Sequence, residues 1–456
     1  MSDINIGMLF VFLIIFVIFY LLFKLIGGGA TDIWTIKKDM EREPKEKKII
    51  FNEDTVLIGD KKSKNFSLPA KMSHVFICGT TGSGKTVAIS NFIKCAIDNE
   101  YPLLLVDGKG DEGNDSILEI VKMMKKDRKL YVINMNDPKN SDKYNPFKDT
   151  KPTIIKDMLI SLTVWSEEHY KLNTERYLQR VISAMEMCEI PFSFETIIHY
   201  LTGDNFLVLS SKLVKENTIT KEKHIENADL VKSTKTIIEG AIARFATIFE
   251  NEIGDLFSSE GIDIFSALKE KAIILFILNP LIYPELSTLF GKLTIIDSKK
   301  AVAKLYKEKL GRTFFIFDEI NVYASKQFLD LVNKSRSADV TSILACQSLS
   351  DLDANESADF KEQVIENTNT HIVLRQNSNK NATEWADIIG TRETVNVTYQ
   401  LSNENGVVSD TGKGSATKGR KYIMHPDDIK NLPMGNAFVV SKDYKIKKKL
   451  KINKPF

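Results

Sequence analysis

The feature that most constrains this chain is a phosphate-binding loop at residues 79–86. These residues read Gly-Thr-Thr-Gly-Ser-Gly-Lys-Thr, which fits the pattern of a glycine, four residues and then Gly-Lys-Ser/Thr. An apolar run at 74–78 predicts a strand before the loop, and apolar residues at helical spacing over 89–97 predict a helix after it. With both flanks in place, the pattern favours an α/β nucleotide-binding fold over a Gly/Ser/Thr-rich turn that binds nothing.

The loop residues have the chemistry that a triphosphate requires. Glycines let successive backbone N–H groups converge where a Cβ would collide, and the helix N-terminus adds its dipole. Lys85 is expected to reach the β- and γ-phosphates, and the Thr86 hydroxyl to coordinate Mg²⁺. We therefore predict ATP and Mg²⁺ as cofactors, held by Gly79, Thr80, Thr81, Gly82, Ser83, Gly84, Lys85 and Thr86.

An acidic pair after a second apolar segment is the predicted partner of this loop. Residues 313–317 are almost uninterruptedly apolar, which is typical of a strand buried on both faces, and Asp318 and Glu319 follow directly. Asp318 is predicted to bind Mg²⁺ together with Thr86, and Glu319 to polarise the attacking water as a general base. The sequence therefore predicts hydrolysis of ATP as well as its binding.

Three further polar residues are candidates for the same site. A predicted core strand at 339–346 ends in Gln347, and ligands of open α/β sheets collect at the carboxyl ends of strands, so Gln347 is a candidate γ-phosphate sensor. The alternative is a glutamine that begins a surface loop. Arg336 and Arg375 flank this strand in sequence, and either could complete a neighbouring subunit's site or have an ordinary surface role.

A second apolar feature lies near the N-terminus. Residues 6–23 form a run of 18 residues interrupted only by Gly7 and Tyr20, enough to cross a hydrocarbon core of ~30 Å at ~1.5 Å per residue. The sequence predicts a single transmembrane helix at 5–26 and a tether at 27–48. By the positive-inside rule, the N-terminus is outside the cell membrane and the C-terminal domain is cytoplasmic, because six basic residues follow the run: Lys37, Lys38, Arg42, Lys45, Lys47 and Lys48. The alternative, a cleaved signal peptide, lacks its basic n-region.

The remaining chain reads as one sheet domain with an insertion. Helical patterns separate most of the predicted strands, which argues for a doubly wound sheet over 49–149 and 266–456. Helical stripes fill the interval between, and predict an all-helical insertion at 150–265. The predicted strands are 74–78, 103–106, 130–133, 273–278, 314–317, 340–345, 371–374 and 437–440.

Composition singles out two C-terminal segments. Residues 402–420 are rich in Ser, Asn, Gly and Thr, which predicts a mobile loop. Residues 442–454 hold seven lysines against one aspartate, and are either an edge strand protected by charge or a phosphate- or lipid-binding segment. The net charge of +2 does not by itself indicate a nucleic-acid partner, and the histidines and cysteines show no metal-ligand spacing.

Several separate motifs agree with one family. The chain resembles the coupling proteins of conjugation and type IV secretion, the TraD/TraG kind, within the FtsK/HerA superfamily of RecA-like motors. The resemblance spans roughly residues 70–440, and its motifs occur in the family's order. They are the loop at 79–86, Asp-Gly-Lys-Gly-Asp at 107–111, Tyr-Asn-Pro-Phe at 144–147, Phe-Asp-Glu-Ile at 317–320, Lys-Ser-Arg-Ser-Ala at 334–338, Ala-Cys-Gln-Ser-Leu-Ser-Asp-Leu at 345–352 and His-Ile-Val-Leu-Arg at 371–375.

The resemblance implies a RecA-like P-loop NTPase domain, an all-α domain at the cytoplasmic mouth of a ring, and a homo-hexamer with a central channel. It supports Gln347 as sensor and makes Arg375 the first choice for a trans-acting finger, with Arg336 second. The implied partners are DNA, single-stranded rather than duplex, together with relaxase or relaxosome proteins and secretion channel components. The implied function is an ATP-driven DNA translocase that delivers a DNA–relaxase substrate to a conjugative channel.

The chain departs from the family pattern in two places. It shows one predicted membrane span where many members have two, and Gly108 replaces a proline, which should loosen that turn. Two alternative functions stay open. One is an FtsK- or HerA-like translocase of duplex DNA, and the other is an ATP-gated recruitment platform at the membrane that moves nothing.

Overall fold

The computed structural model describes residues 17, 51, 53–353, 359–404 and 407–456. They belong to two compact units, Phe51–Asn381 with Lys430–Phe456, and a second that includes Ala382–Ile429. Apart from residue 17, the predicted transmembrane helix at 5–26 and tether at 27–48 lie outside the described residues. None of the described helices combines the length and apolar character needed to cross a membrane.

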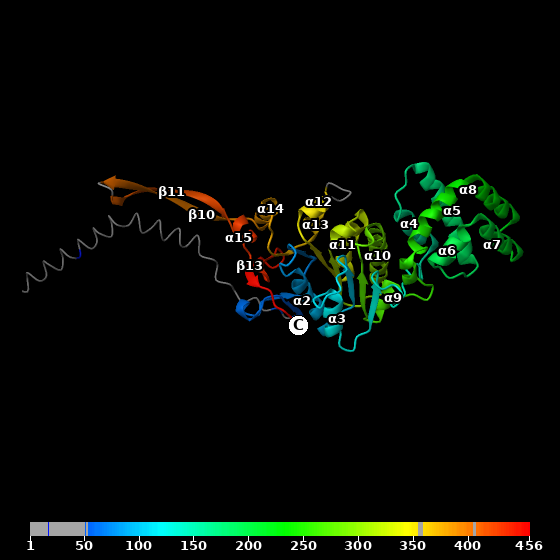
Figure 1. Ribbon diagram of the computed structural model, residues 1–456, viewed down its shortest axis with the longest axis horizontal. Helices are drawn as coiled ribbons and strands as arrows, with labels where there is room; N and C mark the ends of the chain where they lie inside the picture. The colour runs from blue at the N-terminus through cyan, green and yellow to red at the C-terminus, as the bar shows by residue number, and fades with distance from the viewer. Residues whose placement is uncertain (1–16, 18–50, 52, 354–358, 405–406) are drawn as a thin grey trace, which may run out of the picture. The chain divides into compact units, whose positions relative to one another are not determined.

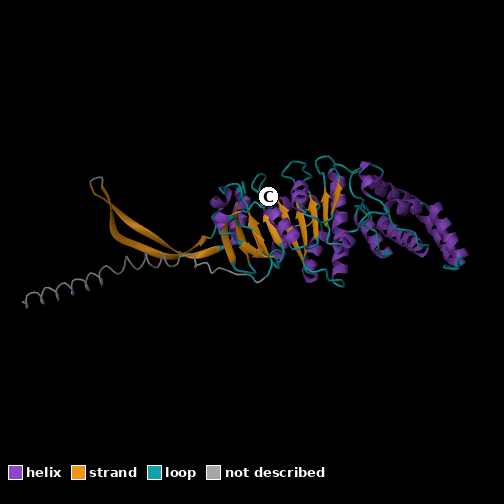
Figure 2. Ribbon diagram, turned by 90° about the horizontal axis from the view of Figure 1, so that it is seen from below, coloured by secondary structure: helices purple, strands orange, loops and turns teal. Residues whose placement is uncertain are grey.

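A nine-stranded sheet forms the centre of the first unit (Figure 2). Its order is β13-β12-β9-β3-β8-β7-β4-β6-β5, in which the strands from β9 to β5 run parallel to one another. β12 is antiparallel to both of its neighbours, β9 and β13. All eight predicted strands are present, so the predicted α/β class is confirmed. The strands are β3 (Val75–Cys78), β4 (Leu103–Asp107), β5 (Leu130–Asn134), β6 (Ile273–Ile277), β7 (Thr313–Asp318), β8 (Val340–Cys346), β9 (Thr370–Val373), β12 (Asn436–Ser441) and β13 (Ile446–Lys451).

Helices cover both faces of this sheet (Figure 1). One face packs against α2 (Lys85–Asp98) and α3 (Ile117–Met124). The other packs against α10 (Pro284–Leu305) and α11 (Lys326–Ser335), where the ring of Phe276 meets Phe290 and that of Phe317 meets Phe328. Coverage on both sides explains why β4, β6, β7 and β8 are buried along their whole length.

The interval predicted to be all-helical contains helices and one 3-10 turn over its described length. They are α4 (Pro152–Ser161), α5 (Glu168–Met187), α6 (Phe194–Leu201), α7 (Gly203–Lys215), α8 (Lys221–Phe249) and the 3-10 turn η2 (Glu252–Leu256), and α9 (Ile264–Lys269) leads back to β6. The predicted stripes face inward, because Tyr177, Val181 and Met185 on α5 and Ile238 and Phe245 on α8 are buried. The domain boundaries at 150 and 265 stay predictions.

The predicted mobile loop at 402–420 is wrong, because nearly all of it lies in paired strands. β10 (Thr391–Glu404) and β11 (Val407–Tyr422) form an antiparallel ribbon in the second unit, which also holds most of α14 (Asn379–Ile389) and α15 (Pro426–Lys430). A two-stranded ribbon is held by its main-chain ladder and needs no apolar face to pair. A composition rich in Ser, Gly and Thr is therefore compatible with the strand β11, and it led to a wrong prediction here.

The lysine-rich tail forms β13, the outermost strand of the sheet, so it has the predicted position of an edge strand. Ile446 and Leu450 are buried on the face that packs with α2, whereas Lys447, Lys449 and Lys451 are exposed. A short ribbon of β1 (Thr55–Leu57) and β2 (Ser67–Pro69) lies close by, with the 3-10 turn η1 (Lys61–Ser63) between its strands. Charged edge strands of this kind disfavour pairing with another chain.

Candidate nucleotide site

The phosphate-binding loop joins the carboxyl end of β3 to the first turn of α2, as predicted. Gly82 has φ +73° and Gly84 has φ +108°, a region that is strained for residues with a Cβ. At Gly79 the restriction is spatial, because a Cβ would lie 2.5 Å from Ser83 Oγ and 2.7 Å from Leu374 Cβ. Each glycine of the motif is therefore required by conformation or by space.

The loop fits the phosphates of a nucleotide. Helix α2 is 14 residues long, and the N–H groups of its first turn carry the positive end of the helix dipole. Ser83 is buried, and within the described part of the chain its hydroxyl has no hydrogen-bond partner. Such an unpaired polar atom beside free helical N–H groups is suited to a phosphate oxygen.

The acidic pair at the end of β7 lies directly against the loop lysine. Lys85 Nζ is 3.4 Å from Asp318 Oδ1 and donates a hydrogen bond to Glu319 Oε1. The three side chains are only 10%, 3% and 7% exposed. Burial lowers the pKa of Lys85, but the charges of the two carboxylates outweigh it and raise the pKa above its usual range. Lys85 therefore stays cationic. Its contact with Asp318 and Glu319 brings together the phosphate-binding loop and the acidic pair, which are more than 200 residues apart in sequence.

Backbone contacts hold the acidic pair in place. Glu319 has φ 49° and ψ 54°, in the left-handed region, and its N–H donates to Asp318 Oδ1 at 3.0 Å. The carbonyl oxygen of Asp318 accepts hydrogen bonds from Tyr323 Oη at 2.8 Å and from the N–H of Gly108 at 3.2 Å. The turn that presents Glu319 is thus fixed from two sides.

Gly108 lies tightly packed behind the acidic pair. A Cβ at this position would lie 2.7 Å from the carbonyl oxygen of Asp318 and 3.0 Å from Glu319 Cβ. A proline there would bring such atoms and would also lack the N–H that donates to Asp318. Gly108 therefore permits a close approach between the Asp-Gly-Lys-Gly turn and the acidic pair.

Gln347 links the loop to the acidic pair. Its Oε1 accepts from Thr81 Oγ1 at 3.3 Å, and its Nε2 donates to Glu319 Oε1 at 3.3 Å. Burial and the neighbouring Asp318 raise the pKa of Glu319, while Lys85 opposes them. Gln347 is thus where the sequence predicted it, at the carboxyl end of β8. Its role as a γ-phosphate sensor stays a prediction.

The two candidate arginines lie in different places. The carbonyl oxygen of Arg375 accepts from Thr80 N at 3.1 Å and Thr80 Oγ1 at 3.2 Å, so this residue adjoins the loop of its own chain. Arg336 is exposed and begins the 3-10 turn η4 (Arg336–Ala338), which precedes the amino end of β8. The phosphate-binding loop and Glu319 are at the carboxyl ends of the strands, so Arg336 is remote from its own site.

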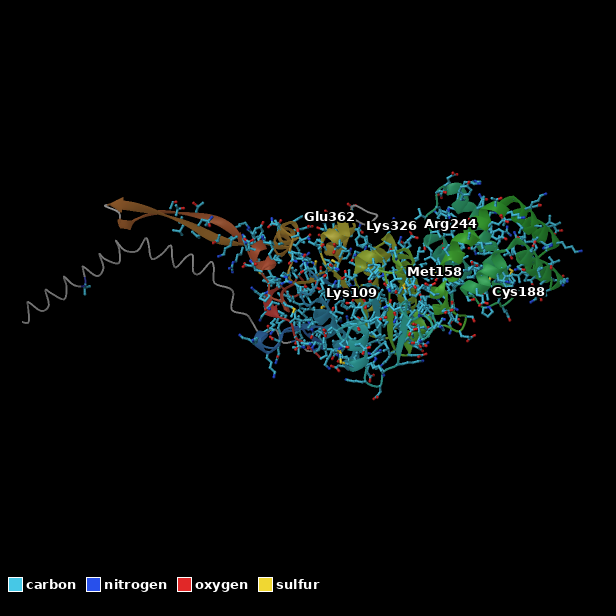
Figure 3. All side chains as sticks on the ribbon, viewed as in Figure 1. Lys109, Met158, Cys188, Arg244, Lys326 and Glu362 are labelled. Carbon is cyan, nitrogen blue, oxygen red and sulfur yellow. The ribbon has the colours of Figure 1, made fainter. Side chains whose placement is uncertain are left out.

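Two further residues, Asp107 and Tyr323, lie beside the acidic pair. Asp107, at the end of β4, is in register with Asp318 and is buried beside it, and burial and the charge of Asp318 raise its pKa to about 7. Two adjacent buried carboxylates suit a divalent cation. Tyr323 is the other residue, and it donates a hydrogen bond to the carbonyl oxygen of Asp318. In the sequence, its position five residues after Asp318 is the one sign of this contact. Lys109, labelled in Figure 3, belongs to the same turn as Gly108, but its side chain is exposed and pairs with Asp111.

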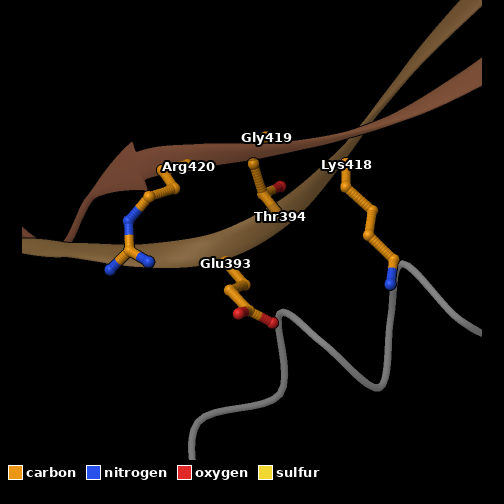
Figure 4. A pocket seen from close by; sticks show the side chains of 5 residues that line it. All are labelled: Glu393, Thr394, Lys418, Gly419 and Arg420. Carbon is orange, nitrogen blue, oxygen red and sulfur yellow. The ribbon is translucent and has the colours of Figure 1, made fainter.

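A hollow elsewhere on the molecule holds none of the predicted site residues. It lies on the β10–β11 ribbon and is lined by Glu393, Thr394, Lys418, Gly419 and Arg420 (Figure 4). Arg420 Nε donates to Thr391 Oγ1 at 2.7 Å, so its guanidinium is engaged along the ribbon. The nucleotide site is identified by its motif and geometry and not by the size of a cavity.

A glycine loop ending in Gly-Lys-Thr, packed against an Asp-Glu pair at the tip of a central parallel strand, defines a P-loop nucleotide-binding protein. Residues 65–450 match the family described as the type IV secretion-system coupling protein DNA-binding domain. The chain belongs to this family, which confirms the resemblance inferred from its motifs.

Solved structures share the fold. The bacterial conjugative coupling protein TrwBdeltaN70, in its unbound monoclinic form, superposes with a TM-score of 0.64 at 15% identity over 92% of both chains. Plasmid coupling protein TrwB in complex with ADP and Mg²⁺ gives 0.61 at 15% identity over the same shares. VirB4 of Thermoanaerobacter pseudethanolicus gives 0.55 at 12% identity, over 90% of this chain and 98% of that one.

Proposed function

We propose that this protein is a membrane-anchored, ATP-driven DNA translocase that recruits a DNA–relaxase substrate and delivers it to a conjugative type IV secretion channel. The observation that carries the proposal is the contact of Lys85 with Asp318 and Glu319 in a chain of the coupling-protein family. TrwB, which shares the fold, has been solved with ADP and Mg²⁺. ATP and Mg²⁺ are therefore the proposed cofactors here.

The proposed reaction is hydrolysis of ATP to ADP and phosphate. Bound Mg²⁺–ATP supplies the scissile phosphoanhydride and a cation that offsets its charge. With the nucleotide bound, Lys85 would contact phosphate oxygens in place of the two carboxylates, and Thr86 and Asp318 would hold the cation or its water shell. Glu319, freed from Lys85, accepts a proton from the attacking water, and its raised pKa favours that transfer. Gln347, which touches both Thr81 and Glu319, connects the loop to the base.

We also propose that the active form is a homo-hexamer in which an arginine from one subunit completes the next subunit's site. Arg336 is exposed and remote from its own loop, which suits a trans-acting finger. The main chain of Arg375 adjoins Thr80 of its own loop, which favours a role in cis. Mixing Glu319→Gln subunits with Arg336→Ala or Arg375→Ala subunits separates the two. If the substituted arginine acts in trans, a Glu319→Gln subunit supplies the missing arginine to a neighbour whose Glu319 is intact, and ATPase activity returns. If the arginine acts in cis, the mixture stays inactive.

The proposed location is the cell membrane, with one span, the N-terminus outside and the large C-terminal part in the cytoplasm. The apolar run at 6–23 and the basic residues that follow it support this arrangement. The proposed partners are DNA, preferably single-stranded, together with relaxase or relaxosome proteins and channel components. The family description supports DNA among them.

DNA-stimulated hydrolysis tests the proposal. The full chain in detergent or lipid, under oligomerising conditions at low salt, should hydrolyse ATP faster with single-stranded DNA than without, and the stimulation should decrease with salt. Lys85→Ala is the control that removes ATP-dependent turnover. Stimulation by duplex DNA alone would favour the FtsK- or HerA-like alternative. An unchanged rate with either DNA would contradict translocation and favour an ATP-gated recruitment platform.

A further inference from the structure

A dense lysine surface lies at the β13 edge of the sheet, outside the nucleotide site. We call it the basic edge and define it by six exposed lysines. Three alternate along β13 and three belong to or follow η1: Lys447, Lys449, Lys451, Lys61, Lys62 and Lys64. These two groups are almost 400 residues apart in the chain, so the surface is made by the fold and not by one charged tail.

Hydrogen bonds fix η1 against β13. Lys451 N donates to Ser63 Oγ at 2.8 Å, and the carbonyl oxygen of Lys451 accepts from Asp60 N at 3.0 Å. The carboxylate of Asp60 accepts from Ser63 N at 3.0 Å and so caps the turn. The lysines therefore project from a rigid frame, in which β1 and β13 also carry buried apolar residues of the core.

Most lysines of this surface have no acidic partner among the described residues. Within the described part of the chain, Lys61, Lys62, Lys64, Lys449 and Lys451 have no carboxylate within ion-pair distance. Clustered like charges repel one another, and for these five lysines no ion pair with a described acidic side chain offsets that repulsion. A surface of this kind is suited to an anionic counterpart from outside the chain.

We propose that the basic edge docks on the anionic lipid headgroups of the membrane. Clusters of four to eight basic residues close to a membrane anchor attract anionic lipids. The nearby aromatic rings are engaged in packing, because Phe66 lies under Lys448 and Tyr444 packs against Phe51. Single-stranded DNA binding would call for rings on which bases stack, whereas a headgroup layer requires only charge.

The position of the surface along the chain supports lipid as the occupant. Phe51, whose ring lies 5.4 Å from that of Tyr444, brings the first part of the described chain to the turn before β13. The 24 residues from 27 to 50 can span at most about 80 Å, so this edge stays within that distance of the bilayer and can reach it. This step rests on the proposed membrane anchor at 6–23.

Lysine footprinting tests the docking. The full chain is reconstituted into vesicles of phosphatidylcholine alone or of phosphatidylcholine mixed with phosphatidylglycerol, which makes the surface anionic. Its lysines are then acylated briefly with an amine-reactive reagent. Mass spectrometry then gives the rate at each lysine. We expect the six lysines of the basic edge to react at least threefold more slowly in the anionic vesicles, and high salt to remove the difference.

Lys221, Lys232 and Lys235 on α8 are exposed and serve as internal controls that should react equally in both vesicles. A variant with Lys447→Gln, Lys449→Gln and Lys451→Gln should lose the protection of Lys61, Lys62 and Lys64, whereas a variant with Lys221→Gln, Lys232→Gln and Lys235→Gln should keep it. Equal rates in both vesicles would overturn the proposal. Protection that appears only with added oligonucleotide would also overturn it, and would favour DNA.

Alkaline carbonate extraction of the same vesicles separates this proposal from the anchor. A chain that stays in the membrane but shows no protection contradicts lipid docking alone. A chain that is extracted contradicts the anchor. The acylation rates in anionic and neutral vesicles still show whether the basic edge docks on anionic lipid.

Discussion

The carboxyl edge of the sheet and the β10–β11 ribbon use polar residues in opposite ways. At the carboxyl edge, Lys85, Asp318 and Glu319 are buried and interlocked, and a turn from β4 presses against the acidic pair. In the ribbon, the described side chains are exposed or half-buried apart from Thr394 and Val395, and the strands are held by main-chain pairing. The first arrangement leaves little freedom for substitution, whereas the second tolerates it widely.

The difference follows from where each region's stability comes from. A buried charge without its partner costs several kcal/mol, so each member of the carboxyl edge depends on the others. A ladder of backbone hydrogen bonds is indifferent to most side chains that face water. Substitutions should therefore affect activity and stability more at the carboxyl edge of the sheet than in the ribbon.

The largest effect is expected at the base. Glu319→Gln removes the proton acceptor and keeps the size of the side chain, so ATP should still bind while turnover decreases by about 10² to 10⁴-fold. Single-turnover hydrolysis and nucleotide titration measure the two quantities. Glu112→Gln is the matched control at an exposed site and should leave turnover unchanged. Normal turnover in Glu319→Gln would exclude this residue as the base.

The next effect tests close packing behind the acidic pair. Gly108→Ala places a Cβ 2.7 Å from the carbonyl oxygen of Asp318, and forcing it in should destabilise the chain by about 1–3 kcal/mol. Urea denaturation of the two proteins measures the loss. Gly113→Ala, at a position with no atom within 4 Å, should be neutral. Equal stability of both variants would show that the turn can move away.

A smaller effect is expected in acid, from the buried His74 that directly precedes β3. Burial lowers the pKa of His74 to about 4, so the unfolded chain takes up its proton first as the pH falls. The stability contribution is complete above about 6.5 and is lost as the pH falls towards 4, which amounts to roughly 1 kcal/mol by pH 5.5. Urea midpoints should decrease over this range, and less so in His74→Gln. Identical pH profiles would contradict the burial of His74.

The smallest effect is expected in the ribbon. At Gly419 an added Cβ would meet the end of the flexible Asn396 side chain at 2.8 Å, which can move aside. Gly419→Ala should therefore change stability by less than about 0.5 kcal/mol. A loss as large as that of Gly108→Ala would remove the contrast between the two regions.

Much of the sheet could be predicted because its strands have local signals. Runs such as 273–278 and 314–317 are apolar without alternation, and strands buried on both faces have this pattern. The loop at 79–86 and the pair Asp318–Glu319 were predictable as well, since their chemistry fixes their spacing and flanks. The contact between them is what the structure adds.

The rest depended on distant partners. Residues 407–420 look unstructured until they are paired with β10, and no local pattern indicates that pairing. The reason for Gly108 lies more than 200 residues away, at Asp318. The basic edge likewise joins residues near 61 to residues near 449, which composition alone presents as two unrelated charged segments.

The Mg²⁺ dependence of ATP affinity tests the central claim most directly. If the loop and the acidic pair surround one metal-bound triphosphate, Mg²⁺ should tighten ATP binding to the unaltered chain, and Asp318→Asn should abolish that gain while leaving metal-free binding largely intact. If Asp318→Asn responds to Mg²⁺ as the unaltered chain does, the two motifs do not share a nucleotide and the proposed mechanism is contradicted.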